Sequence, residues 1–131
     1  MQQGYDLIGD IHGCGETLIV LLEQMGYSKI NGVYQHKSRK VVFLGDIIDR
    51  GPHIRLACEV VRSMVDAGHA HMIMGNHEYN LVTYMTPAPA GVKRPYLRPH
   101  TERNSFIVEQ TVEQFADHPQ EFKEYLEWFS K

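Results

Sequence analysis

The stretch VVFLGDIIDRG, residues 41–51, joins a short apolar run to a turn that is rich in glycine and aspartate. Four consecutive apolar residues followed by a glycine are typical of a buried strand that ends in a tight turn. A similar arrangement occurs twice more, with Gly9 after the short, mainly apolar run Tyr5–Ile8 and Gly75 after the run His71–Met74. The sequence therefore predicts three buried strands, each of which ends beside polar residues.

Amphipathic segments separate these three strands. Apolar residues recur at helical spacing over Glu16–Met25, and again between Pro52 and Gly68. Between the first helix and the second strand, the dipeptide Asn31-Gly32 predicts a small hairpin. Alternating strands and helices predict an α/β fold with a parallel sheet, in which ligands bind beyond the carboxyl ends of the strands.

The second half of the chain has a different pattern. Residues 86–99 are rich in proline and predict an irregular loop, whose basic side chains are most simply solvated. Residues 101–130 predict a helical segment, with helices over Phe106–Phe115 and Pro119–Phe129. We expect one apolar face of the last helix to lack a covering element; its members are Phe122, Leu126 and Phe129.

The composition is that of one globular domain spanning residues 1–131, with 43% apolar residues, 22% charged residues and a formal net charge of -3. This charge does not indicate a nucleic-acid partner. No apolar run approaches the roughly 20 residues that a membrane span needs. Since the start of the chain lacks a secretory pattern and only Cys14 and Cys58 are present, we expect a cytoplasmic protein.

Asp10, His12 and Asp46 follow the first two predicted strands. In extended backbone, side chains two residues apart point the same way, so Asp10 and His12 can share one divalent metal ion. Asp46 is expected at the same edge of the sheet, where its two oxygens can bridge two metal ions. The alternative is that these residues belong to ordinary polar loops.

Four further residues at this edge carry chemical groups. Arg50 can bind a phosphate with two parallel hydrogen bonds, although Asp49 and Arg50 can also form a simple surface pair. Asn76 offers a neutral oxygen ligand, and His77 is a proton donor near neutral pH. The alternative is that Asn76 caps a following helix and His77 is an exposed residue of its first turn.

Three motifs considered together are more specific than each motif alone. They are DxH at residues 10–12, GDxxDRG at 45–51 and GNHE at 75–78. This combination resembles the metallophosphoesterase (calcineurin-like) superfamily over residues 5–79, and most resembles the branch of serine/threonine protein phosphatases and bacterial diadenosine tetraphosphatases. The resemblance implies that the parallel sheet forms half of an αββα sandwich, and that the activity is metal-dependent hydrolysis of phosphoric esters.

The resemblance also implies two divalent metal ions. Asp10, His12 and Asp46 are then the ligands of the first ion, while Asp46 and Asn76 are ligands of the second, with Asp46 bridging. A hydroxide held between the ions would attack phosphorus in line. Mixed oxygen and nitrogen ligands favour Mn, Fe, Zn or Co.

The remaining motif residues acquire catalytic and substrate-binding roles from the same resemblance. His77 would protonate the leaving oxygen, and Asp49 would orient His77. Arg50 would neutralise charge on the phosphoryl group, and Asn76 would contact the substrate as well as the metal. The implied substrate is a phosphate ester; phosphoproteins, dinucleoside polyphosphates and the phosphate ends of nucleic acids all remain open.

The chain departs from the family pattern after residue 79. The family supplies further histidines to the second metal, but only His100 and His118 follow His77, and neither succeeds a strand pattern. We therefore expect a well-occupied first metal site, a weak second site and a truncated domain that represents an N-terminal half. The alternative function is a catalytically weak fragment that binds metal or self-associates through the uncovered face of its last helix.

Overall fold

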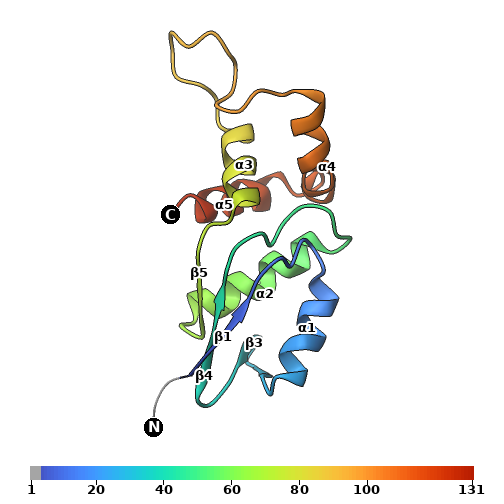
Figure 1. Cartoon of the computed structure of the whole chain (residues 1–131), viewed down its shortest axis with the longest axis vertical. Coiled ribbons are helices and arrows are strands. Elements are labelled where there is room, and N and C mark those ends of the chain that lie inside the picture. Colours follow the sequence, from blue (N-terminus) through green and yellow to red (C-terminus); the bar gives the residue numbers. More distant parts are fainter. Residues whose placement is uncertain (1–3) are drawn as a thin grey trace.

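A parallel three-stranded sheet organises the first half of the computed structural model, which describes residues 4–131 (Figure 1). The strands lie in the order β1-β4-β5. The central strand β4 pairs in parallel with β1 on one side and with β5 on the other. Their bounds are Gly4–Ile8 for β1, Arg39–Phe43 for β4 and Ala70–Met72 for β5. The predicted α/β fold with a parallel sheet is confirmed.

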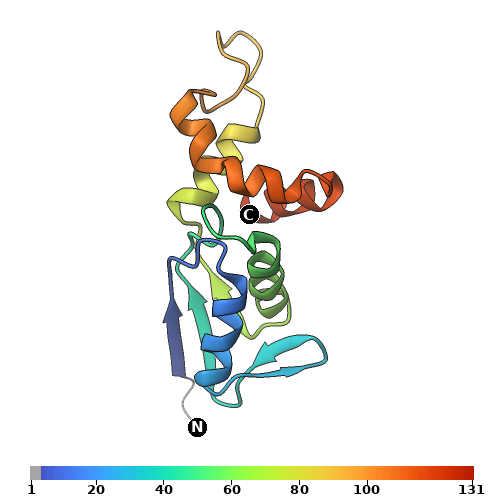
Figure 2. The same cartoon turned by 90° about the vertical axis from the view of Figure 1, so that its right-hand side faces the viewer.

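Two helices cover one face of this sheet, as Figure 2 shows. They are α1 (Gly15–Gln24) and α2 (Ile54–Asp66), and their apolar stripes supply buried residues such as Leu22 and Val61 to the core. A hairpin of β2 (Ser28–Ile30) and β3 (Val33–Gln35) follows α1. The predicted turn at Asn31-Gly32 is present, and both residues have the positive φ that a two-residue hairpin loop requires.

The opposite face of the sheet is open. Tyr5 and Leu7 of β1 are 57% and 67% exposed, and Ile73, directly after β5, is 56% exposed. Alternate residues of a strand point to opposite faces, and in Figure 2 both helices lie on the same side of the sheet. The expectation of a buried first strand is therefore wrong for every second residue of β1.

Three helices make up the second half of the molecule, above the carboxyl edge of the sheet in Figure 1. They are α3 (Asn76–Met85), α4 (Glu102–Phe115) and α5 (Pro119–Phe129). Gly75 occupies the N-cap position of α3, so Asn76 is its first helical residue. The proline-rich loop between α3 and α4 folds back on itself through a bridge between Pro87 and Tyr96. Within residues 4–131, no helix combines the length and apolar character needed to cross a membrane.

The last helix does not leave its apolar face uncovered. Tyr125 and Phe129 of α5 are buried, and Phe122 stacks on Phe115 of α4 with ring centroids 5.0 Å apart. Leu126 is partly buried against the same core. The expectation that this helical face is uncovered is therefore wrong, because α3 and α4 pack against it. Exposed apolar side chains do lie on the open side of the sheet, among them Tyr5, Leu7 and Ile73.

Candidate metal and phosphate site

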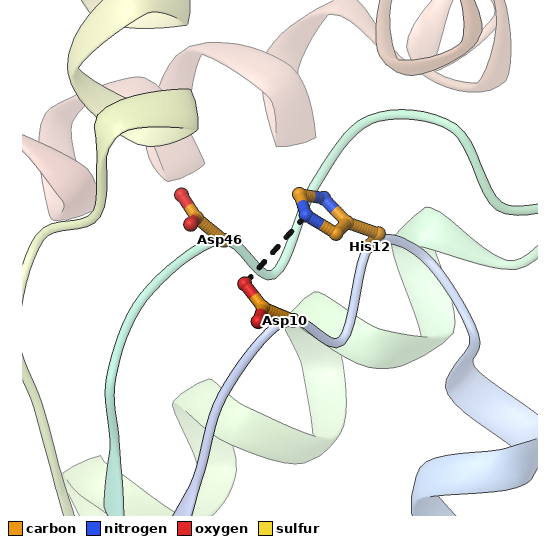
Figure 3. Close-up of side chains that lie close together, drawn as sticks. All are labelled: Asp10, His12 and Asp46. Atoms are coloured by element: carbon orange, nitrogen blue, oxygen red, sulfur yellow. Dashed lines mark ion pairs between the residues drawn. The ribbon is translucent and has the colours of Figure 1, made fainter.

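Three predicted metal ligands meet at the carboxyl edge of the sheet (Figure 3). Asp10 and His12 lie in the loop after β1, and Asp46 lies in the loop after β4. One ligand atom from each side chain can be chosen so that all three lie within 4.8 Å of one another. The predicted ligands of the first metal ion therefore form one cluster, although Asp10 and His12 lie beyond the end of β1 and not in a strand.

The two loops reach this arrangement through left-handed backbone. Asp10, His12 and Asp46 have φ values of 51°, 43° and 54°, so the pair after β1 is not extended as its spacing suggested. The loops are joined by backbone hydrogen bonds: the N–H of His12 donates to the Asp46 carbonyl at 2.9 Å, and the N–H of Gly13 donates to the Ile47 carbonyl at 2.7 Å. Convergence of the ligands thus depends on the contact between the two loops.

The His12 ring is held in one orientation. Its Nδ1 lies 3.0 Å from the carbonyl oxygen of Ile48, which can only accept, so Nδ1 carries the proton and donates. The other nitrogen, Nε2, is then free as a ligand and lies 3.9 Å from Asp10 Oδ1. A histidine that donates from one nitrogen to a backbone carbonyl and coordinates with the other is a common arrangement at metal sites.

The donor set fits a divalent ion. Two carboxylates and one imidazole suit Mn, Fe, Zn or Co. With metal–ligand bonds of about 2.1 Å, donors to one ion lie roughly 3.0–4.2 Å apart, which is closer than the span of this cluster. The Asp10 side chain is 83% exposed, so a small rotation can close that difference. These three residues therefore could hold one ion.

A buried acid–base pair lies beside this cluster. Asp49 is fully buried, and its Oδ2 is 2.7 Å from Nδ1 of His77 on α3. This contact leaves Nε2 of His77 for other partners. The rings of His77 and His12 are 4.6 Å apart in an edge-to-face arrangement. The predicted contact between Asp49 and His77 is therefore present in the structure, next to the three possible ligands.

Thr111 of α4 is a member of this cluster that the sequence did not reveal. Its hydroxyl donates to Asp49 Oδ1 at 2.6 Å and accepts from the Asp49 backbone N–H at 3.0 Å. Thr111 is fully buried. No local pattern marks it, because 62 residues separate the two partners and only the fold brings them together.

Glu78 holds the loop after β4. Its carboxylate accepts backbone N–H bonds from Asp46 at 2.6 Å, Ile47 at 2.9 Å and Gly75 at 3.0 Å. Burial raises the pKa of the Glu78 carboxyl above its ordinary value, and these N–H groups oppose the shift because they favour the charged form. The GNHE motif contains this residue, but the sequence alone assigns it no role.

Arg50 and Asn76 complete the predicted set. Arg50 is exposed and lines an open cleft together with His77. Asn76 is exposed at the start of α3, and the next residue, His77, donates its backbone N–H to Asp46 Oδ1 at 3.0 Å. Both residues thus lie at the same edge as the metal cluster and the Asp49–His77 pair.

Two relatives among curated proteins carry the same name. The chain is 36% identical over 124 residues to the bis(5'-nucleosyl)-tetraphosphatase PrpE [asymmetrical] of Halalkalibacterium halodurans, covering 94% of this chain and 49% of that protein. It is 48% identical over 73 residues to the protein of the same name from Oceanobacillus iheyensis, covering 55% of this chain and 29% of that one. The chain thus spans at most about half the length of these relatives.

A solved structure of a mutant cold-active protein tyrosine phosphatase shares the fold, with a TM-score of 0.53 at 22% identity. The match covers 85% of this chain and 32% of that one. The family model described as calcineurin-like phosphoesterase matches residues 5–131. This match includes the three strands, the metal cluster and all three helices of the second half, and the chain therefore belongs to the calcineurin-like phosphoesterase family.

Proposed function

We propose that this protein hydrolyses phosphoric esters with the help of divalent metal ions. The observation that carries the proposal is the position of a buried Asp49–His77 pair directly beside the Asp10, His12 and Asp46 cluster. A metal site alone is compatible with a structural ion. A histidine that is oriented by a buried carboxylate next to that site adds a group that can transfer protons.

The residues of the chain divide between holding metal and handling the substrate. Asp10, His12 and Asp46 would hold the first ion, while Asp46 and Asn76 would offer ligands to a second ion that we expect to bind weakly. An ion bound in this site supplies Lewis-acid polarisation of a phosphoryl oxygen.

Proton transfer and phosphate binding come from the protein itself. His77 donates a proton from Nε2 to the leaving oxygen, while Asp49 keeps Nδ1 engaged and so fixes the ring. Arg50 pairs with the phosphoryl oxygens through its planar guanidinium.

Dinucleoside tetraphosphates are the substrate class that we propose, because the relatives named above carry that activity in their names. The oxygen of water bonds to phosphorus, and one bridging P–O bond breaks. The departing oxygen takes the proton from His77, which is reprotonated from solvent, and the attacking water releases a proton to solvent. Asymmetrical cleavage gives a nucleoside triphosphate and a nucleoside monophosphate.

Product analysis tests this proposal. The 131-residue chain, and a version extended to the length of its relatives, are incubated with Mn²⁺ and diadenosine tetraphosphate, a phosphopeptide or a 5'-phosphorylated RNA. We expect ATP and AMP from the first substrate, and a loss of turnover of roughly 10²–10⁴-fold in His77→Asn at unchanged metal content. Symmetrical ADP formation or preferred release of phosphate from the peptide would contradict the substrate class.

A second property, which concerns the 131-residue chain as it stands at about half the length of its relatives, follows from the open face of the sheet. We propose that the 131-residue chain associates with a second copy through this face, because exposed apolar side chains gather there and not on the last helix. This property and the hydrolase are compatible, since the carboxyl edge that carries the metal cluster is separate from the open face.

A further inference from the structure

An open cleft of about 430 Å³ lies between α3 and α4, and it is bordered by His77, whose ring is 4.6 Å from that of His12. This volume is within the range of about 300–1,000 Å³ that is typical of sites for small molecules. Arg50 and His77 border the cleft at its end near the metal cluster, and side chains of the two helices form the rest. The lining from the helices includes Asn80, Phe106, Ile107 and Gln110.

Phe106 is the most exposed large apolar side chain among the described residues, at 75%. The buried face of α4 carries Val108, Thr111 and Phe115, so Phe106 lies away from the core of the protein. Gln110 is one turn further along α4 and lines the same cleft. The cleft thus presents an aromatic ring and amide groups, which together suit a planar polar ring.

The position of α4 beside the catalytic pair is fixed by hydrogen bonds. Thr111 binds Asp49 through two contacts, and Gln114 accepts from the Ile54 N–H at 2.7 Å and donates to the Gly51 carbonyl at 2.8 Å. These bonds attach α4 to the loop that carries Asp49 and Arg50. Phe106 is therefore presented on a rigid element, next to the group that protonates the departing oxygen.

We propose that this cleft binds the nucleobase of the departing nucleotide, with Phe106 stacking on the base. The proposal rests on the proposed function and extends it to substrate specificity. The phosphate chain of that nucleotide leaves from His77 and Arg50, so its base is directed into the adjoining cleft. The amides of Asn80 and Gln110 offer both donors and acceptors to the edge of the base. Glu109, also in the lining, adds an acceptor and disfavours a further phosphate deep in the cleft.

Binding measurements separate the base from the phosphates. Calorimetric titration of the 131-residue chain compares ATP with inorganic triphosphate in the presence of Mn²⁺, for wild type and Phe106→Ala. Stacking on an aromatic side chain contributes about 1–3 kcal/mol per base, so we expect ATP binding to weaken roughly 5- to 150-fold. Inorganic triphosphate should bind equally to both proteins, and Phe106→Trp should retain ATP binding. Tyr79→Ala is the matched control, because Tyr79 is 59% exposed on α3 but outside the cleft.

Kinetics of the active form complete the test. Phe106→Ala should raise KM for diadenosine tetraphosphate and leave KM for inorganic tetraphosphate unchanged. Unchanged ATP affinity in Phe106→Ala, equal weakening for both ligands, or absence of any ATP binding to wild type would overturn the assignment of the cleft. Phe106-dependent ATP binding without hydrolysis of any phosphate ester would instead refute the proposed function and leave the base-binding cleft supported.

Discussion

Backbone strain is concentrated in the residues of the candidate site. Six residues other than glycine have positive φ in the described chain, and five of them are Asp10, His12, Asp46, Asp49 and Arg50; the sixth is in the hairpin turn. The left-handed conformation costs roughly 1–2 kcal/mol for a residue with a Cβ atom. Such strain persists where surrounding contacts over-determine it, which is typical of functional sites. The loops of this site are therefore held in place at a cost in stability.

Arg50 allows this strain to be measured. It has φ 73° and is exposed, so its replacement disturbs little packing. We expect the Arg50→Gly variant to have a free energy of unfolding about 1 kcal/mol higher than that of the Arg50→Ala variant, because glycine adopts positive φ freely. Lys123 lies on the exposed side of α5. There the Lys123→Gly variant should be less stable than the Lys123→Ala variant by a similar amount, since glycine disfavours helices. Urea denaturation measures both pairs, and equal stabilities of the two Arg50 variants would show that this residue is not strained.

Asp46 is the residue whose loss should damage metal binding most. Asp46→Asn keeps an oxygen that can accept the His77 N–H but removes the charge from the only proposed ligand of both ions. We expect Mn²⁺ affinity to fall at least about tenfold, or 1.4 kcal/mol. Asn76→Ala should have a smaller effect, because it removes a neutral ligand of the weak second site alone. Calorimetric titration with Mn²⁺ compares the two variants, and a larger loss in Asn76→Ala would refute the bridging assignment.

Thr111 should act on turnover through Asp49. Thr111→Val preserves shape but removes both hydrogen bonds to Asp49. In an active form of the protein we expect kcat to fall roughly 10- to 100-fold, as for other residues that orient a ligating or catalytic group, with KM little changed. Thr111→Ser should restore kcat because it restores the hydroxyl.

Thr83→Val provides the matched control for Thr111. The Thr83 hydroxyl bonds only to backbone carbonyls of its own helix, α3, so its loss should leave kcat unchanged. Equal losses in Thr111→Ser and Thr111→Val would reduce Thr111 to a packing role.

At the scale of elements, the sequence predicted what local patterns encode. The apolar runs ending in glycine marked β1, β4 and β5, and helical spacing marked α1 and α2, because side-chain periodicity follows directly from backbone geometry. The α3 helix was less evident, since only Glu78 and Leu81 of its residues are buried and its apolar stripe is short. Features that depend on residues far apart in the sequence have no local pattern. Examples are the hydrogen bonds between Thr111 and Asp49 and the exposure of one face of β1.

Close approach between two loops explains one glycine at the strand ends. Gly45 has φ 85°, and a Cβ atom there would collide with the backbone nitrogen and Cα of Gly75. We expect Gly45→Ala to lower the free energy of unfolding by several kcal/mol and to disrupt metal binding, because the loops after β4 and β5 must separate.

Gly68 isolates the contribution of this collision. It has a similar φ of 82°, but nothing lies within 4 Å of the added Cβ. Gly68→Ala should therefore cost only about 1 kcal/mol, the effect of conformation alone. Thermal unfolding and Mn²⁺ titration are the measurements, and equal costs at the two glycines would exclude crowding between the loops.

For the whole molecule, the two faces of the sheet have opposite character. One face is closed by α1 and α2 (Figure 2). The other face exposes Tyr5, Leu7 and Ile73. Contiguous exposed apolar side chains favour association, and β1 and β5 are also edge strands of the sheet. The family resemblance placed this sheet in half of a sandwich, in which both faces of the sheet are covered. The structure of residues 4–131 provides a cover for one face only.

Charge placed on the open face should therefore prevent the 131-residue chain from associating with itself. Full burial of a leucine or isoleucine side chain contributes about 1.5–3 kcal/mol, and a symmetric pair of copies buries each residue twice. We expect the double variant Leu7→Lys, Ile73→Lys to raise the dissociation constant of the dimer by more than roughly 100-fold. Val20→Lys is the control, because Val20 is 52% exposed on α1, away from this face. Sedimentation velocity at several concentrations measures the effect. A wild-type chain that stays monomeric throughout, or a double variant that associates as strongly as Val20→Lys, would show that the open face does not bind a second copy.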